Sequence, residues 1–133
     1  MFMKLVDSSA WVEFLRKKGD PAVKQVVARL IQAELAAYTC PIRFELLSGV
    51  KADEEADLEQ AFAFSHHLPF EREDWREAAL LERQLRAKGQ TVPRNDLFVA
   101  TVAIRAGLTV TCRDTHFDAL RRTVGARLKV EQV

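Results

Sequence analysis

The hydrophobic residues of the chain occur in short runs that alternate with segments of helical spacing. Four apolar runs have the length of buried strands, and they lie at residues 3–7, 36–40, 108–112 and 128–133. Segments with the apolar spacing and cap residues of helices lie at 10–19, 20–33, 42–47, 53–66, 71–88 and 93–106, and a loop with a short helix follows at 114–122. This alternation predicts a three-layer α/β/α domain with a mostly parallel central sheet of about four to five strands.

The boundaries of these elements follow from cap and turn residues. Ser8 and Ser9 precede the first helix as cap residues, and Asp20 with Pro21 begins the second. The helix at 93–106 is apolar nearly all round, so we expect it to be buried on most sides.

Length and composition limit the class of protein. The chain of 133 residues has the size of one domain, predicted to span residues 1–133. Its composition, 48% hydrophobic and 29% charged, excludes a disordered protein. No apolar stretch reaches the roughly 20 residues of a membrane span, and the start lacks the pattern of a signal peptide. Because two cysteines are too few for a disulfide framework, we expect a cytoplasmic protein in which Cys40 and Cys112 are reduced and half-buried.

The charge of the chain is balanced overall and uneven along its length. A formal net charge of +1 gives no general basic signature of nucleic-acid binding. Basic residues are in excess within residues 94–133. This excess fits a phosphate-facing surface, and it fits an ordinary solvated face equally well.

Four acidic residues are the main candidates for chemistry. Asp7 ends one predicted strand and Asp114 follows another, at the edge of a parallel sheet where ligands bind. Glu45 and Asp96 interrupt otherwise apolar helices, where an ionised carboxylate needs a positive partner. Four carboxylates at one point suit Mg²⁺ or Mn²⁺, which bind oxygen ligands. Such an ion can activate water and offset negative charge at a phosphorus atom.

Each of these acids also has a structural alternative. Asp7 can cap the first helix, and Asp96 can act as favourable negative charge in a first helical turn. Glu45 can pair with Arg43, Lys51 or a distant arginine, and Asp114 can stabilise an Asx turn. These alternatives stay open from the residues alone.

The histidines are interpreted as structural residues. His66 and His67 have the position of solvated capping residues at a helix end, and His116 is assigned to the surface although it lies close to Asp114. The sequence contains no Cys/His spacing of a zinc site, no Gly-rich phosphate loop and no Gly-x-Ser-x-Gly elbow.

Four short motifs give the chain a resemblance to a known family. The motifs are Leu5–Trp11, Phe44–Gly49, Asn95–Thr101 and Thr111–Phe117. In this order and with these gaps they resemble the four motifs of PIN-domain proteins, and most closely those of VapC-type toxins from prokaryotic toxin–antitoxin pairs. The resemblance covers essentially the whole chain.

The resemblance implies a PIN-like fold and an endoribonuclease that hydrolyses RNA phosphodiester bonds with Mg²⁺ or Mn²⁺ as cofactor. The catalytic residues that it implies are Asp7, Glu45, Asp96 and Asp114. The implied metal ligands are Asp7, Asp96 and Asp114, with Glu45 and Asp118 as further ligands. It also implies a homodimer and a cognate VapB-type antitoxin whose tail occupies the active-site groove. The candidate apolar face for the dimer comprises Trp11, Phe14 and residues 53–66.

Neighbouring residues complete the implied site. Ser9 stands beside the first acid as a small hydroxyl residue, and Asn95 precedes the third acid; both are supporting residues. Cys112 stands where many members have Thr or Ser, and a thiol is the weaker hydrogen-bond donor. Arg94 and Arg113 are candidates for holding phosphate, because a guanidinium matches phosphate oxygens.

Two rival hypotheses remain. A non-catalytic interaction module would keep the PIN fold without its metal, but the presence of all four acids argues against it. A receiver-like or phosphatase-like phosphoryl-transfer domain also places Asp after a first strand. The second acid that such a phosphatase needs is replaced here by Ser9.

Overall fold

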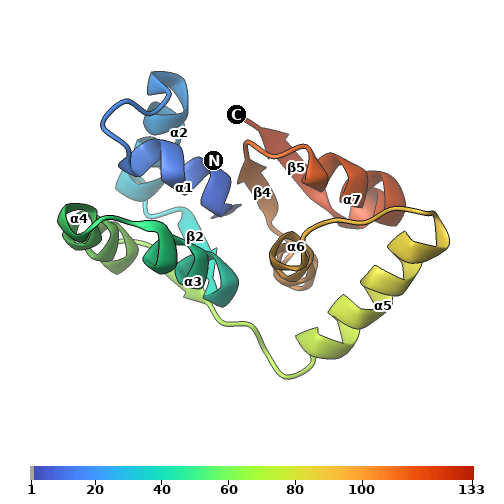
Figure 1. Cartoon of the computed structure of the whole chain (residues 1–133). Helices are drawn as coiled ribbons and strands as arrows, with labels where there is room; N and C mark the ends of the chain where they lie inside the picture. Colours follow the sequence, from blue (N-terminus) through green and yellow to red (C-terminus); the bar gives the residue numbers. More distant parts are fainter. Residues whose placement is uncertain (1) are drawn as a thin grey trace.

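The central sheet has five parallel strands in the computed structural model, which describes residues 2–133 (Figure 1). The strands are β1 (Lys4–Val6), β2 (Ala36–Thr39), β3 (His66–Leu68), β4 (Thr109–Cys112) and β5 (Lys129–Gln132). They pair in the order β3-β2-β1-β4-β5. Parallel neighbours need crossover connections, and helices provide each of them. The prediction of a mostly parallel sheet of four to five strands is confirmed.

Seven α-helices cover the sheet within residues 2–133. They are α1 (Ser8–Leu15), α2 (Pro21–Gln32), α3 (Cys40–Gly49), α4 (Ala52–Ala63), α5 (Asp74–Ala87), α6 (Arg94–Ala106) and α7 (His116–Val124), and a 3₁₀ turn at Gly125–Arg127 precedes β5. In Figure 1, α1–α4 gather beside β1 and β2, whereas α5–α7 gather beside β4 and β5. The predicted three-layer α/β/α architecture is therefore confirmed.

The winding of the chain reverses between the two central strands. From β1 it proceeds through β2 to the edge strand β3, then crosses to β4 and proceeds outward to β5. In open α/β sheets, ligands bind at the carboxyl ends of the strands that flank such a reversal. Strands β1 and β4 pair directly, with Leu5 opposite Val110 and Val6 opposite Thr111. The residues that follow these two strands therefore lie side by side.

The core consists of strand residues and the apolar sides of the helices. All four residues of β2 are buried, and so are Trp11 of α1 and Phe117 of α7. Helix α6 buries every residue from Asp96 to Ala103 except Phe98. The expectation that this helix is covered on most sides is confirmed.

An ion pair fixes α5 against α6, the helix that carries Asp96. Asp74 is buried and accepts a hydrogen bond of 2.9 Å from Nε of Arg105. Nη2 of Arg105 also donates to the carbonyl of Pro69 at 2.9 Å. Because one guanidinium joins two segments, the start of α5 is held next to the end of α6.

The interpretation of His66 and His67 as helix-end residues is wrong. Helix α4 ends at Ala63, and both histidines lie in β3, opposite Ala37 and Tyr38 of β2. The His67 ring stacks on the Tyr38 ring with their centroids 5.0 Å apart. A strand of three residues is too short to display a period of two, so only its partner strand defines it.

Smaller differences concern helix starts and the cysteines. Helix α1 begins at Ser8 because Asp7, and not a serine, is its N-cap. Helix α5 begins at Asp74, three residues later than predicted from the sequence. Both cysteines are free, but Cys40 is exposed and Cys112 is buried, so the expectation of half-burial is wrong for both. Within the described residues, no helix combines the length and apolar character that a membrane span requires.

Candidate active site

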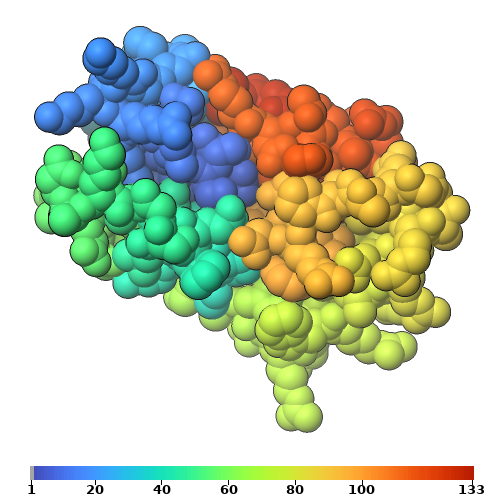
Figure 2. All heavy atoms as spheres, viewed as in Figure 1, coloured from blue at the N-terminus to red at the C-terminus, as the bar shows by residue number. Residues whose placement is uncertain are grey.

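A cleft of about 540 Å³ opens at the carboxyl ends of β1 and β4. Its lining comprises Asp7, Ser8, Ser9, Val12, Glu45, Pro93, Arg94, Asn95, Asp96, Asp114 and His116. In Figure 2, the start of α1 (dark blue), α3 (teal) and the start of α6 (orange) meet around this part of the face. The structure therefore brings together all four acids that the sequence predicts.

Asp7 caps a helix with one carboxylate oxygen and leaves the other without a partner. Its Oδ2 accepts hydrogen bonds from the backbone N–H of Ser9 at 3.1 Å and from the Ser9 hydroxyl at 2.7 Å. Its Oδ1 is buried and has no hydrogen-bond partner. Burial raises the pKa of this carboxyl, against the lowering effect of Ser9. The capping alternative and a place in the cleft thus hold for the same residue.

Asp96 lies in the first turn of α6 and is also buried. Only 5% of the residue is exposed, and its Oδ2 lies 3.3 Å from Nδ1 of His116. Burial, and after it the negative charge of Asp7, raises the pKa of Asp96 to about 8. A neutral pH therefore leaves this carboxyl largely protonated as long as no cation faces it.

Glu45 reaches the cleft from α3. Its Oε1 lies 3.4 Å from the Ser8 hydroxyl, which donates to it. Burial raises the pKa of Glu45, and the charge of Asp7 adds to the effect. Arg43 pairs instead with Glu59 at 3.0 Å, so the alternative in which Arg43 neutralises Glu45 is not what the structure adopts.

Asp114 follows β4 and is held by its neighbours. Its Oδ1 accepts a hydrogen bond of 2.9 Å from the backbone N–H of His116, which is the predicted Asx-type contact. Its own backbone N–H donates to the side-chain oxygen of Gln132 at 3.1 Å, and Gln132 donates back to the Asp114 carbonyl at 2.8 Å. The thiol of Cys112 lies 3.9 Å from the same carbonyl. Because burial raises the pKa of Cys112 to about 12, this side chain stays a thiol and a weak donor.

Two of the expected supporting residues line the cleft. The Ser9 hydroxyl donates to Asp7 and accepts a hydrogen bond of 2.9 Å from the backbone N–H of Arg113, which ties the ends of β1 and β4 together. Asn95 lies in the lining beside Asp96. Arg94 also lies there, and its Nε is 3.4 Å from Glu82.

Two other predicted residues lie outside the lining. The guanidinium of Arg113 pairs with Asp20 at 2.7 Å and donates to the carbonyl of Val133 at 3.1 Å. Asp118 accepts a hydrogen bond of 3.3 Å from Gln132. Neither side chain contributes to the cleft surface.

Ser8 and His116 line the cleft but were not among the predicted site residues. The Nδ1 atom of His116 lies 2.8 Å from Oδ1 of Asp114 and 3.3 Å from Oδ2 of Asp96, so the ring is exposed, as predicted, and also lines the cleft. The position of His116 in the first turn of α7, two residues after Asp114, is the feature that could have indicated its place in the cleft.

The residues present fit a divalent cation. One buried carboxylate oxygen, Oδ1 of Asp7, has no hydrogen-bond partner, and a buried carboxylate is costly without a compensating charge. Ligand atoms from Asp96, Asp114 and His116 lie within 4.8 Å of one another. A cation in this cleft would satisfy the unpaired oxygen of Asp7 and reduce the repulsion among the acids.

Comparison with known proteins agrees with this geometry. The family model of the PIN domain matches residues 4–123, so the chain belongs to the PIN-domain family. VapC ribonuclease Mb1587 of Mycobacterium bovis is 38% identical over 125 residues, which cover 90% of this chain and 92% of that protein. Ribonuclease VapC19 of Mycobacterium tuberculosis is 35% identical over 104 residues, 77% of this chain and 81% of that protein. Within the family the chain is thus of the VapC type.

Solved structures show the same fold at lower sequence identity. VapBC2 from Rickettsia felis, bound to a DNA fragment from its promoter, has a TM-score of 0.81 with 18% identity and covers 99% of both chains. DNA-bound VapBC from Salmonella typhimurium has a TM-score of 0.80 with 16% identity, over 99% of this chain and 98% of that chain. The predicted family resemblance is confirmed.

Proposed function

We propose that the protein is a Mg²⁺- or Mn²⁺-dependent endoribonuclease and the toxin of a toxin–antitoxin pair. The observation that carries the proposal is the cleft at β1 and β4, where four carboxylates converge and a buried oxygen of Asp7 lacks a hydrogen-bond partner. The curated relatives at 35–38% identity are themselves named as ribonucleases.

The chain's own residues would divide the work of hydrolysis. Asp7, Asp96 and Asp114 would hold the cation, and Ser9 would orient Asp7 through its hydroxyl. Glu45, in contact with Ser8, would accept a proton from the attacking water. Arg94 and Asn95 at the rim would contact the RNA backbone. When bound, the divalent cation lowers the pKa of water and offsets charge on the phosphorus.

RNA cleavage in the presence and absence of chelator tests this function. Purified protein free of any antitoxin should cut cellular RNA at discrete positions in Mn²⁺, and EDTA should abolish the cuts because the carboxylates then face no cation. Sequencing of the new RNA ends would identify the substrate. Folded protein that binds Mn²⁺ but leaves every RNA class intact would favour the non-catalytic interaction module instead.

A VapB-type antitoxin is the proposed protein partner. A groove of about 790 Å³ adjoins the cleft and shares Val12 and Glu45 with it. Residues from α1, α3 and α4 line it, among them the acidic residues Asp53, Glu54 and Asp57, and the adjoining loops add the basic residues Arg16, Lys17, Lys18 and Lys51. A peptide lying in this groove would reach the acids and exclude RNA. We place both partners in the cytoplasm, where free cysteines persist and RNA is available.

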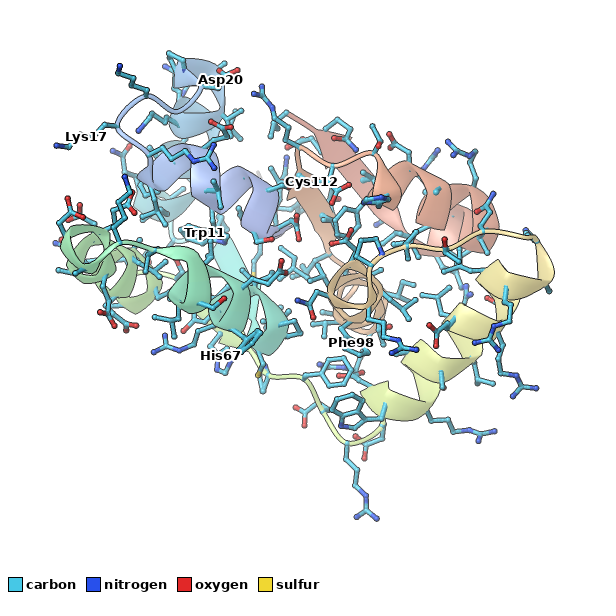
Figure 3. All side chains as sticks on the ribbon, viewed as in Figure 1. Trp11, Lys17, Asp20, His67, Phe98 and Cys112 are labelled. Atoms are coloured by element: carbon cyan, nitrogen blue, oxygen red, sulfur yellow. The ribbon has the colours of Figure 1, made fainter. Side chains whose placement is uncertain are left out.

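A homodimer is the proposed oligomeric state, but its surface differs from the one predicted. Trp11 is fully buried and cannot form a dimer face. An aromatic cluster joins Phe70, Trp75 and Phe98, whose ring centroids lie 4.7–5.4 Å apart. Trp75 is 60% exposed, and Figure 3 shows Phe98 on the side of α6 that faces the start of α5. A second copy would cover this aromatic cluster.

Trp75→Glu should weaken the dimer, since a charge would enter an apolar interface. We expect the dimer dissociation constant to rise at least about 30-fold, measured by sedimentation velocity over a concentration series. Phe64→Glu is the matched control, because Phe64 is also 60% exposed and lies on the other half of the molecule. Equal effects of the two substitutions would contradict the assignment.

A further inference from the structure

We infer that His116 is a nitrogen ligand of the divalent cation and gives this site a preference for Mn²⁺ over Mg²⁺. The inference rests on the proposed metal-dependent function and deepens it. It starts from the position of the imidazole: Nδ1 lies 2.8 Å from Asp114 and 3.3 Å from Asp96, inside the cleft that contains the acids.

The ligand atoms of the three residues form one group. Those of Asp96, Asp114 and His116 all lie within 4.8 Å of one another, which a single ion can bridge. An independent observation points to an ion at the same place. Asp7 is 1% exposed and lines the same cleft, and its Oδ1 is buried without a hydrogen-bond partner.

The fold does not need the imidazole ring for its own stability. The backbone N–H of His116 already makes the turn contact to Asp114 at 2.9 Å. The His116 side chain is 48% exposed, so it contributes little to the core. The only partners that the structure gives the ring within the described residues are Asp96 and Asp114. The ring therefore serves the cleft, and a ligand role accounts for its orientation.

A nitrogen ligand changes which ion the site favours. Mg²⁺ requires near-ideal octahedral geometry and gives up its water ligands reluctantly, so an imidazole adds little to its binding. Mn²⁺ is a first-row transition-metal ion, and nitrogen as well as oxygen ligands contribute to its affinity. Removal of the imidazole should therefore weaken Mn²⁺ binding more than Mg²⁺ binding. We expect a rise of about tenfold in the Mn²⁺ dissociation constant and a change below about threefold for Mg²⁺ in His116→Gln protein.

Pulsed EPR of the Mn²⁺-loaded protein tests the inference without relying on activity. Wild-type protein should show nitrogen modulation from a directly bound imidazole, and His116→Gln and His116→Asn should lose it while circular dichroism shows them folded. His67→Gln is the matched control and should keep the modulation, because His67 contacts Tyr38 and Cys40 away from the cleft. Calorimetric titration with each metal would measure the change in preference.

The possible results distinguish the ligand role of His116 from the metal-dependent nuclease function. Stoichiometric Mn²⁺ binding without nitrogen modulation in wild-type protein would overturn the ligand role of His116 and leave the proposed nuclease intact. Modulation that survives both His116 substitutions would overturn it as well. Wild-type protein that binds neither Mn²⁺ nor Mg²⁺ would overturn the inference together with the metal-dependent function.

Discussion

Asp96→Asn should lower the rate of RNA cleavage by at least about 10²–10³-fold, the usual cost of removing one preorganised electrostatic contact from an active site. Asp96 is buried in the cleft, and its Oδ2 faces the ring of His116 at 3.3 Å. The amide keeps the volume of the side chain but cannot supply a negative ligand. Single-turnover cleavage of a short RNA at saturating Mn²⁺ would measure the loss.

Asp118→Asn is the control for this experiment. Asp118 was predicted as a further metal ligand, yet it lies outside the cleft lining and accepts a hydrogen bond from Gln132. We expect its cleavage rate to stay within about threefold of wild type, because this half-buried side chain lies outside the cleft and contacts Gln132 there. Equal losses in the two variants would show that the acids are misassigned.

The metal-free protein should become less stable as the pH rises from about 4 to about 8. The pKa of Asp96 is raised from 3.8 to about 8, so the folded state holds a proton that the unfolded state releases at lower pH. When the folded state binds more protons, the free energy of unfolding falls with rising pH. The raised pKa values of Asp7 and Glu45 act in the same direction. The stabilisation is complete below the pKa that Asp96 has in the unfolded state, and it is lost once the pH has risen past the pKa of Asp96 in the folded state.

Thermal denaturation in EDTA from pH 5 to pH 9 would measure this dependence. Asp96→Asn should flatten the curve and, at pH 8.5, melt above wild type by on the order of 5 °C. Mn²⁺ at about 100 times its dissociation constant at pH 8 should add about 2.7 kcal/mol to the free energy of unfolding of the wild-type protein. The same Mn²⁺ concentration should add less at pH 5, where protons compete with the ion for the carboxylates. A variant whose melting temperature follows the wild-type curve would contradict the assigned pKa.

The convergence of the four acids on one cleft could be predicted from the sequence for two physical reasons. Asp7 and Asp114 end adjacent parallel strands, and any such strands deliver their following residues to one edge. Glu45 and Asp96 are charged residues in otherwise apolar helices, and a buried charge is costly unless it faces a partner. The order and spacing of the four motifs indicated the PIN-domain family, and the alternation of strands and helices predicted the fold.

Other features depend on contacts that the sequence does not reveal. Strand β3 has three residues and exists through pairing with β2. Arg113 was a candidate for binding phosphate, but it pairs with Asp20, a residue 93 positions away. The ring of His116 is exposed, but its 3.3 Å contact with Asp96 on another helix places it in the cleft. In each case a contact with another element decides where the residue lies.

The hydrogen bond between Ser9 and Arg113 joins residues that are 104 positions apart in the chain. One side of the cleft is therefore translated at the start of synthesis, and the other only after β4. A nascent chain without β4 lacks Asp114 and the contact that holds β1 and β4 together, so it has no complete site. The ribosome must therefore translate β1 through Asp114 before the cleft can form, and a polypeptide truncated before this point would lack nuclease activity.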